Sequence, residues 1–203
     1  LLTNPVMCDI IEKYWRNGGK IQFVSDCGGG DVLSGIKKSI DHGAVACYIH
    51  GAAGDRLAEK GDWDVMAKAL ELIRSNGVPA GIGGHRLETV SGSVAHGLKP
   101  DFWMKTLHRS DYWSFRHPER KGNKYCDDPD GVIAYMQTLE EPWIAFKTLA
   151  AGAVRPQDAF RWCFESGADF ICVGMYDFQL VEDANLAHDI LSGNIFRKRP
   201  WRA

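Results

Sequence analysis

The chain has 203 residues, of which 45% are apolar and 25% charged, a balance typical of a globular protein with one sizeable core. A net charge of -2 and a pI near 6.4 argue against a general nucleic-acid-binding protein. No apolar run reaches the ~20 residues that a membrane-spanning helix needs. We therefore expect the protein to act on a small-molecule substrate and to bind neither nucleic acid nor a membrane. A homo-oligomer is possible. The basic cluster at the C-terminus is expected to be a solvated tail, formed by Arg197, Lys198, Arg199 and Arg202.

The cysteine pattern indicates buried free thiols rather than a disulfide framework. Cys27, Cys47, Cys163 and Cys172 lie inside apolar strand or helix patterns, and no Cys-x-x-Cys occurs. This usage favours a reducing compartment, so we expect a cytoplasmic protein. Because the sequence starts at Leu1 rather than Met, a removed signal peptide and a truncated start both stay open.

The order of predicted elements is regular. Apolar runs of strand length alternate with amphipathic stretches of helix length, which is typical of a parallel sheet covered by helices. Three of the helices end in one repeated phrase, a glycine followed by a strand, written DHGAV, SNGVPA and SGADF in the sequence. The predicted strands cover residues 20–25, 44–50, 79–83, 101–107, 143–149 and 170–174.

These six strands predict an α/β fold of the (β/α)8 TIM-barrel type. A doubly wound sheet is the competing architecture, but GGGD at residues 28–31 is too short for a G-x-G-x-x-G phosphate loop. Six units fall short of eight, and the last two match the end of a barrel. We therefore expect residues 1–203 to form a single barrel domain that lacks its first two strands and supplies the third to the eighth.

The segment 146–175 resembles the last two units of phosphate-binding TIM barrels. It contains a turn of small residues, a helix that begins near Pro156, Gly-Ala-Asp at 167–169 and then a strand ending in Val-Gly. In that family the small residues let backbone N–H groups approach an anion. The resemblance implies a ligand site made of Gly152, Ala153, Gly174 and Met175. Ala153 stands where the family has its second glycine.

Two predicted strands carry a lysine in the same setting, WMKTLH with Lys105 and AFKTLAAG with Lys147. A desolvated lysine amine can form a Schiff base with a carbonyl. The pair resembles class I aldolases such as deoxyribose-phosphate aldolase, which implies Lys105 as the nucleophile and Lys147 as the group that lowers its pKa. The alternative is that both lysines have structural roles and pair with buried carboxylates such as Asp26.

A third group of candidate residues comes from the ends of successive strands. Functional side chains of barrels sit at the carboxyl ends of the strands. Here they include Asp26, His50, His85 and His108, which could bind a divalent metal or act as acid and base near neutral pH. Two further ligand-binding candidates at the same edge are Arg86 and Glu88.

The polar and aromatic stretch at 110–141 is too long for a simple strand–helix loop. It follows the strand of Lys105, at the end where barrels place substrate-covering loops. We expect a lid on the same face as His50 and His85.

Three function classes follow from these patterns. The first is a barrel enzyme that acts on a sugar, sugar phosphate or keto acid by lyase or isomerase chemistry with a strand-borne lysine, Lys147 or Lys105. The second is a metal-dependent isomerase or hydrolase that uses the histidines. The third is a non-catalytic barrel that binds a metabolite.

Overall fold

The computed structural model describes residues 3–28, 30–116 and 125–202. Six strands form one sheet whose order follows the sequence, and the registered pairs β1–β2, β2–β3 and β5–β6 are parallel. This confirms the predicted strand order and the α/β class. The chain divides into two compact units, Leu1–Met104 and Lys105–Ala203, and each is described here by itself.

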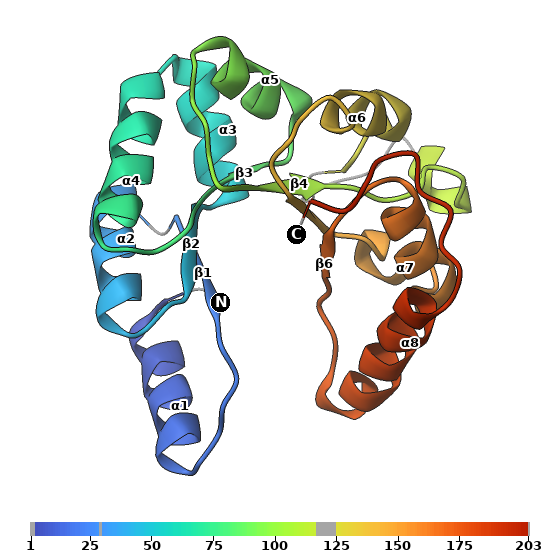
Figure 1. The fold of residues 1–203 in the computed structure, drawn as a ribbon, viewed down its shortest axis with the longest axis horizontal. Coiled ribbons are helices and arrows are strands. Elements are labelled where there is room, and N and C mark those ends of the chain that lie inside the picture. Colours follow the sequence, from blue (N-terminus) through green and yellow to red (C-terminus); the bar gives the residue numbers. More distant parts are fainter. Residues whose placement is uncertain (1–2, 29, 117–124, 203) are drawn as a thin grey trace. The chain divides into compact units, whose positions relative to one another are not determined.

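The first unit alternates strands with helices (Figure 1). Its elements are α1 (Pro5–Arg16), β1 (Val24–Cys27), α2 (Val32–Asp41), β2 (Ala46–Ile49), α3 (Gly51–Lys60), α4 (Trp63–Ser75), β3 (Ala80–Gly84) and α5 (Leu87–Ala95), and β4 (Phe102–Thr106) crosses into the second unit.

Short polar and glycine signals set the helix ends. Asn4 accepts a hydrogen bond from the Met7 N–H at the start of α1, and Asp31 caps α2 through the Ser34 N–H at 3.0 Å. The three repeated glycines all follow a helix with positive φ, +81° at Gly43, +71° at Gly77 and +106° at Gly167. Glycine adopts this left-handed conformation without a steric cost, which explains the repeated strand-entry phrase.

The parity of β1 decides which way its carboxylate points. Ser25 and Cys27 both contact Ser39 of α2, at 2.8 and 3.5 Å, so they face the helices. Successive side chains of a strand point to opposite faces, so Asp26 faces the other side of the sheet. There its register partner on β2 is Tyr48, whose ring meets Phe102 edge-on at 6.3 Å.

The apolar periodicity of the sequence does not reveal helix α3, because the helix begins with the small residues GAAGD. These small residues let it approach β3 closely: a Cβ on Gly54 would lie 2.1 Å from the Gly83 carbonyl oxygen. Apolar periodicity is weak where contact is made by backbone rather than by large side chains.

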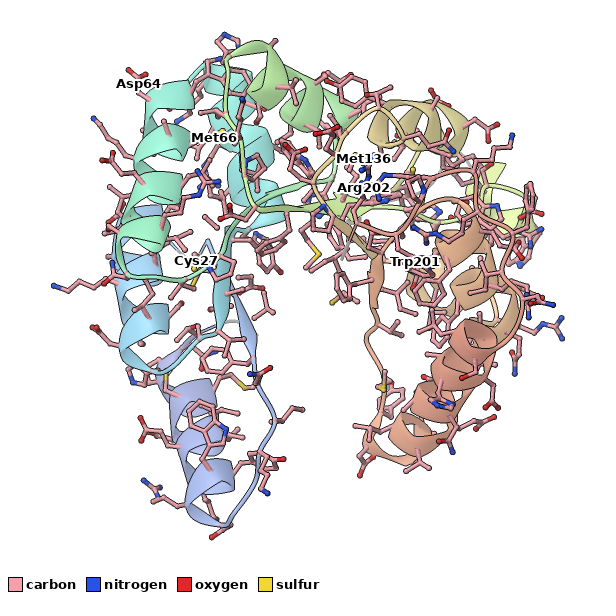
Figure 2. The ribbon with its side chains drawn as sticks, in the orientation of Figure 1. Cys27, Asp64, Met66, Met136, Trp201 and Arg202 are labelled. Atoms are coloured by element: carbon pink, nitrogen blue, oxygen red, sulfur yellow. The ribbon has the colours of Figure 1, made fainter. Side chains whose placement is uncertain are left out.

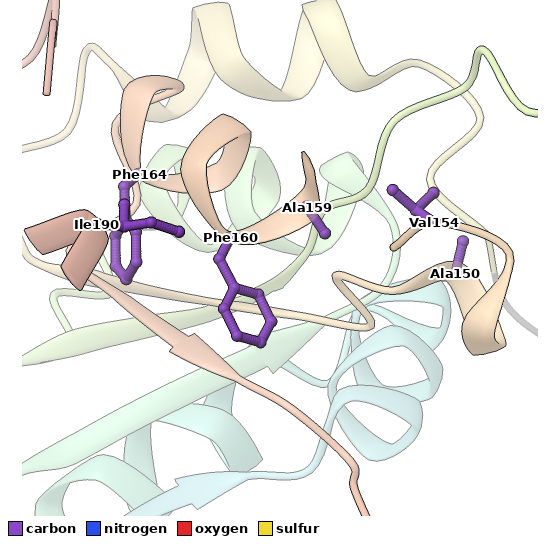
Figure 3. Close-up of a cluster of buried hydrophobic side chains, with 6 residues drawn as sticks. All are labelled: Ala150, Val154, Ala159, Phe160, Phe164 and Ile190. Atoms are coloured by element: carbon purple, nitrogen blue, oxygen red, sulfur yellow. The ribbon is translucent and has the colours of Figure 1, made fainter. Parts of the chain in front are cut away.

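The second unit continues the alternation. After β4 its elements are η1 (Trp113–Arg116), α6 (Pro129–Met136), β5 (Trp143–Phe146), η2 (Ala150–Gly152), α7 (Pro156–Glu165), β6 (Phe170–Cys172), η3 (Asp177–Gln179) and α8 (Leu180–Ser192). Figure 3 shows a buried cluster that joins α7, α8 and the turn after β5, made of Ala150, Val154, Ala159, Phe160, Phe164 and Ile190.

The expectation of a solvated C-terminal tail is wrong. Arg199 is 3% exposed, and its guanidinium lies 2.6 Å from Asp169, which also pairs with Arg197 at 3.2 Å. Arg197 lies over the Trp201 ring, which in turn packs against Phe164 of α7. Figure 2 labels Trp201 in this segment. The segment is buried because the guanidinium groups satisfy one buried carboxylate and several backbone carbonyls, including those of residues 139, 141, 164, 167 and 168.

The predicted lid is partly a regular element. Helix α6 occupies residues 129–136 and supplies the helix that follows β4, so the connection is shorter than 110–141. Its N-cap Asp128 accepts a hydrogen bond from Gly131 at 2.9 Å. Part of the predicted lid, 117–124, lies outside the described residues, and the lid assignment stays a prediction.

All six cysteines are free thiols, and five are buried as expected. The exception is Cys172 on β6, which is exposed. Among the described residues, none of the helices is both long enough and apolar enough to span a bilayer.

Candidate functional site

A cavity of about 400 Å³ opens in the second unit, where β5 and β6 end. It brings together four of the predicted site residues, Lys147, His108, Gly152 and Gly174. The other lining residues are Tyr125, Thr148, Leu149, Ala150, Ala151, Cys172, Val173, Tyr176 and Gln179. The ends of parallel strands are where barrel folds place their active sites, so this cavity is the principal candidate site.

The wall of the cavity after β5 is a strained turn. Lys147, Ala150 and Ala151 have φ of 60°, 47° and 59°, which side-chain-bearing residues seldom adopt. Each such residue costs of order 1–3 kcal/mol, and strain of this kind concentrates at functional sites. The turn also ends the strand at Phe146, three residues before the predicted end at Leu149.

Two backbone N–H groups of the turn form hydrogen bonds within the turn itself. The N–H groups of Gly152 and Ala153 donate to the carbonyls of Leu149 and Ala150, at 2.9 and 3.3 Å. Ala153 is exposed and is not among the residues that line the cavity, and Met175 also lies outside its lining. Gly152 and Gly174 do line the cavity, and the phosphate site implied by the resemblance stays a prediction.

Thr148 is the polar side chain that the motif analysis missed. It is 1% exposed, lines the cavity, and its Oγ1 is buried without a hydrogen-bond partner among the described residues. A buried hydroxyl without a partner costs free energy. The signal in the sequence is its position directly after Lys147, in the turn that follows a barrel strand.

His108 lies at the cavity with both ring nitrogens bonded to backbone groups. Nδ1 is 2.8 Å from the Arg109 carbonyl, and Nε2 accepts the Cys126 N–H at 2.9 Å. This pattern fixes a neutral imidazole that carries its proton on Nδ1. The rings of Tyr112 and Tyr125 lie 5.9 and 6.0 Å from it. His108 thus links the segment after β4 to residue 126, and its catalytic role stays a prediction.

Lys105 is fully buried and does not appear in the lining of the cavity that contains Lys147. Its Nζ donates to the Thr106 carbonyl at 3.1 Å. Burial raises the pKa of the Cys126 thiol, and the positive charge of Lys105 opposes this rise. The nucleophilic role that the resemblance implies for Lys105 stays a prediction.

The first unit contains a second group of ionisable residues, built around a carboxylate that the sequence analysis did not single out. Asp55 of α3 is 4% exposed and accepts from His85 Nδ1 at 2.9 Å and from Thr89 Oγ1 at 2.8 Å. It also accepts the N–H groups of His85 and Arg86. Burial alone would raise the pKa of Asp55, but these hydrogen bonds outweigh it and hold the pKa below the ordinary value.

His50 lies beside this pair, with its ring 6.4 Å from the His85 ring. It caps α3, and its Nδ1 accepts the Ala52 N–H at 3.3 Å. Gly28 makes room for it, because a Cβ there would lie 2.3 Å from the His50 Cβ. Asp26 is half-buried with its Oδ1 unsatisfied among the described residues.

The remaining predicted residues of this unit, Arg86 and Glu88, are exposed at the start of α5. Arg86 lies 3.9 Å from Glu59, a surface ion pair of small energetic weight. Residues 3–28, 30–116 and 125–202 contain no group of three His, Cys, Asp or Glu side chains that could hold a metal ion. The donors present there do not fit the predicted divalent metal.

No family model and no curated protein matches the sequence. Solved structures do: a Pseudomonas aeruginosa protein assigned as an aldo-keto reductase matches with a TM-score of 0.50 at 15% identity, over 92% of this chain and 81% of that one. DHPS from Yersinia pestis, solved with a pterine–sulfa conjugate, matches with a TM-score of 0.50 at 11% identity, over 92% of this chain and 75% of that one.

Identities this low carry information on the fold alone. Together with the sequential parallel strands and the alternating helices, they establish the chain as part of a (β/α) barrel of the TIM type. The predicted fold class is confirmed.

Proposed function

We propose that this chain acts as a barrel enzyme on a small, carbonyl-bearing, oxygenated metabolite such as a sugar or keto acid, by lyase or isomerase chemistry. The observation that carries the proposal is Lys147, held at φ 60° on the wall of the 400 Å³ cavity. Strain at a lysine that also follows a barrel strand is the combination expected of a functional residue.

The chemistry that suits this position is Schiff-base formation. The unprotonated Lys147 amine adds to the substrate carbonyl carbon, the carbonyl oxygen leaves as water, and the resulting iminium accepts electrons from a breaking carbon–carbon or carbon–hydrogen bond. The buried Thr148 hydroxyl, beside Lys147 on the cavity wall, suits a hydroxyl or carbonyl oxygen of the substrate. The cavity volume suits a small metabolite.

Borohydride trapping tests the proposal. The protein is incubated with acetaldehyde, glyceraldehyde or pyruvate, reduced, and mapped by peptide mass spectrometry. Hydride reduction converts the imine to a stable secondary amine, so we expect the adduct at Lys147. Lys147→Arg should abolish it, and Lys198→Arg, at an exposed lysine of the same unit, should leave it unchanged.

An adduct at Lys105, or one spread evenly over surface lysines, would contradict the role given to Lys147. A folded protein that binds such metabolites but forms no adduct would favour the non-catalytic, metabolite-binding alternative.

A further inference from the structure

A second cavity, of about 460 Å³, lies in the same unit along one face of α8. Glu182, Asn185, Leu186 and Asp189 line it at spacings of three, four and seven residues, so they share one side of the helix. Residues 156 and 157, at the start of α7, also line it. We call this cavity the α7–α8 groove, and its lining is completed by Gln179 and Asp183.

The α7–α8 groove is acidic. Three of its lining residues are carboxylates, Glu182, Asp183 and Asp189, and none is a lysine, arginine or histidine. The arginines of α7 have partners elsewhere: Arg155 lies 3.0 Å from Asp158, and Arg161 lies 3.5 Å from Glu165. The amino end of α7 contributes only about half a positive charge, which three carboxylates exceed.

The burial of Asp183 distinguishes the α7–α8 groove from an ordinary, solvent-exposed acidic helix face. Asp183 is 5% exposed, and its Oδ2 is buried with no hydrogen-bond partner among residues 3–28, 30–116 and 125–202. The first turn of α8 favours a negative charge, but that effect is weak. A carboxylate withdrawn from water without a partner is costly, so its retention points to a positively charged ligand.

We propose that the α7–α8 groove binds an organic cation that carries primary ammonium groups. A metal ion does not fit, because the described part of the chain offers no set of three side chains to hold one. Ammonium groups donate up to three hydrogen bonds each, and carboxylate and carboxamide oxygens line the groove along α8. From Glu182 to Asp189 the helix rises about 10 Å, which suits a linear amine with separated charges.

The groove is distinct from the Lys147 cavity but adjoins it. Gln179 lines both cavities, and its Oε1 accepts the Tyr176 N–H at 3.0 Å, next to the first cavity. The cation site does not depend on the chemistry proposed for Lys147. A protein that fails borohydride trapping should still bind the amine, and Lys147→Arg should leave amine binding unchanged.

Calorimetric titration with spermidine at about 0.1 M salt tests the inference, because this salt concentration screens weak surface attraction. The wild-type protein should bind with a sub-millimolar Kd. Asp183→Asn should weaken binding by about tenfold or more, since a charge-assisted hydrogen bond is lost. Glu182→Gln should weaken it less, and Glu140→Gln, at an exposed carboxylate of the same unit, should not change it.

Thermal unfolding without ligand provides the second readout. Asp183→Asn should melt no lower than the wild type, because it removes an unpaired buried charge, and spermidine should stabilise the wild type but not this variant. Equal spermidine affinity in all variants, or no binding at all, would overturn the inference. So would tighter binding of Mg²⁺ than of spermidine. If Asp183→Asn does not fold, an unchanged affinity in Glu182→Gln would also overturn it.

Discussion

At the scale of single residues, the Asp55–His85 pair shows how one carboxylate can organise a strand end. Asp55 receives two side-chain and two backbone hydrogen bonds, all from residues 85–89. It therefore fixes the His85 ring through Nδ1 and holds the backbone of His85 and Arg86, which directly precede α5.

The pH dependence of stability should report on Asp55. Its pKa is lower in the folded protein than in the unfolded chain, so the folded state binds fewer protons. The stabilisation is therefore present above the ordinary Asp value of 3.8 and is lost as the pH falls below it toward the folded value. Urea unfolding across this range measures the loss.

The Asp55→Asn variant should lack this part of the pH dependence and lose about 3 kcal/mol of unfolding free energy near pH 7. Asp62→Asn is the matched control, because Asp62 begins α4 without a side-chain capping hydrogen bond. If Asp55→Asn keeps the acid dependence of the wild type, the hydrogen bonds to Asp55 do not lower its pKa.

At the scale of elements, the turn after β5 combines strain with local backbone bonding. The Ala150 N–H donates to the Lys147 carbonyl and the Val154 N–H to the Leu149 carbonyl, at 2.9 and 3.1 Å. Behind it the cluster of Figure 3 holds Ala150 and Val154 in the core. Packing on one side and a closed turn on the other keep Lys147 in a conformation that it would not adopt alone.

Comparing Lys147→Gly with Lys147→Ala isolates this strain, because both variants remove the side chain. Glycine adopts φ 60° without a steric cost, so Lys147→Gly should be more stable than Lys147→Ala by about 1 kcal/mol in urea unfolding. The sign is opposite to that at an ordinary strand position, where glycine is the less stable residue. A more stable alanine variant would show that the turn is not strained at Lys147.

At the scale of the whole molecule, the sequence predicts what depends on local pattern. All six strands are located because their runs are apolar, and three of the preceding helices end at a glycine, Gly43, Gly77 and Gly167. The location of the Lys147 cavity could be predicted because barrel folds place functional side chains at the carboxyl ends of their strands. The role of Asp55 and the burial of Arg199 are missed because their partners lie 30 residues away, and no local signal encodes such a contact. The bonding of the Gly152 and Ala153 N–H groups within the turn is also missed, because residue spacing does not reveal where backbone N–H groups point.

Thiol reactivity should report on the fold as a whole. Five of the six cysteines are buried and Cys172 is exposed, so one thiol should react rapidly with a thiol reagent under native conditions and all six after urea unfolding. Peptide mapping should assign the fast site to Cys172. Because Cys172 also lines the Lys147 cavity, a carbonyl metabolite trapped there should slow its labelling. Rapid labelling of Cys27 or Cys163 would contradict the burial described here, and labelling of Cys172 that a trapped ligand leaves unchanged would place that ligand elsewhere.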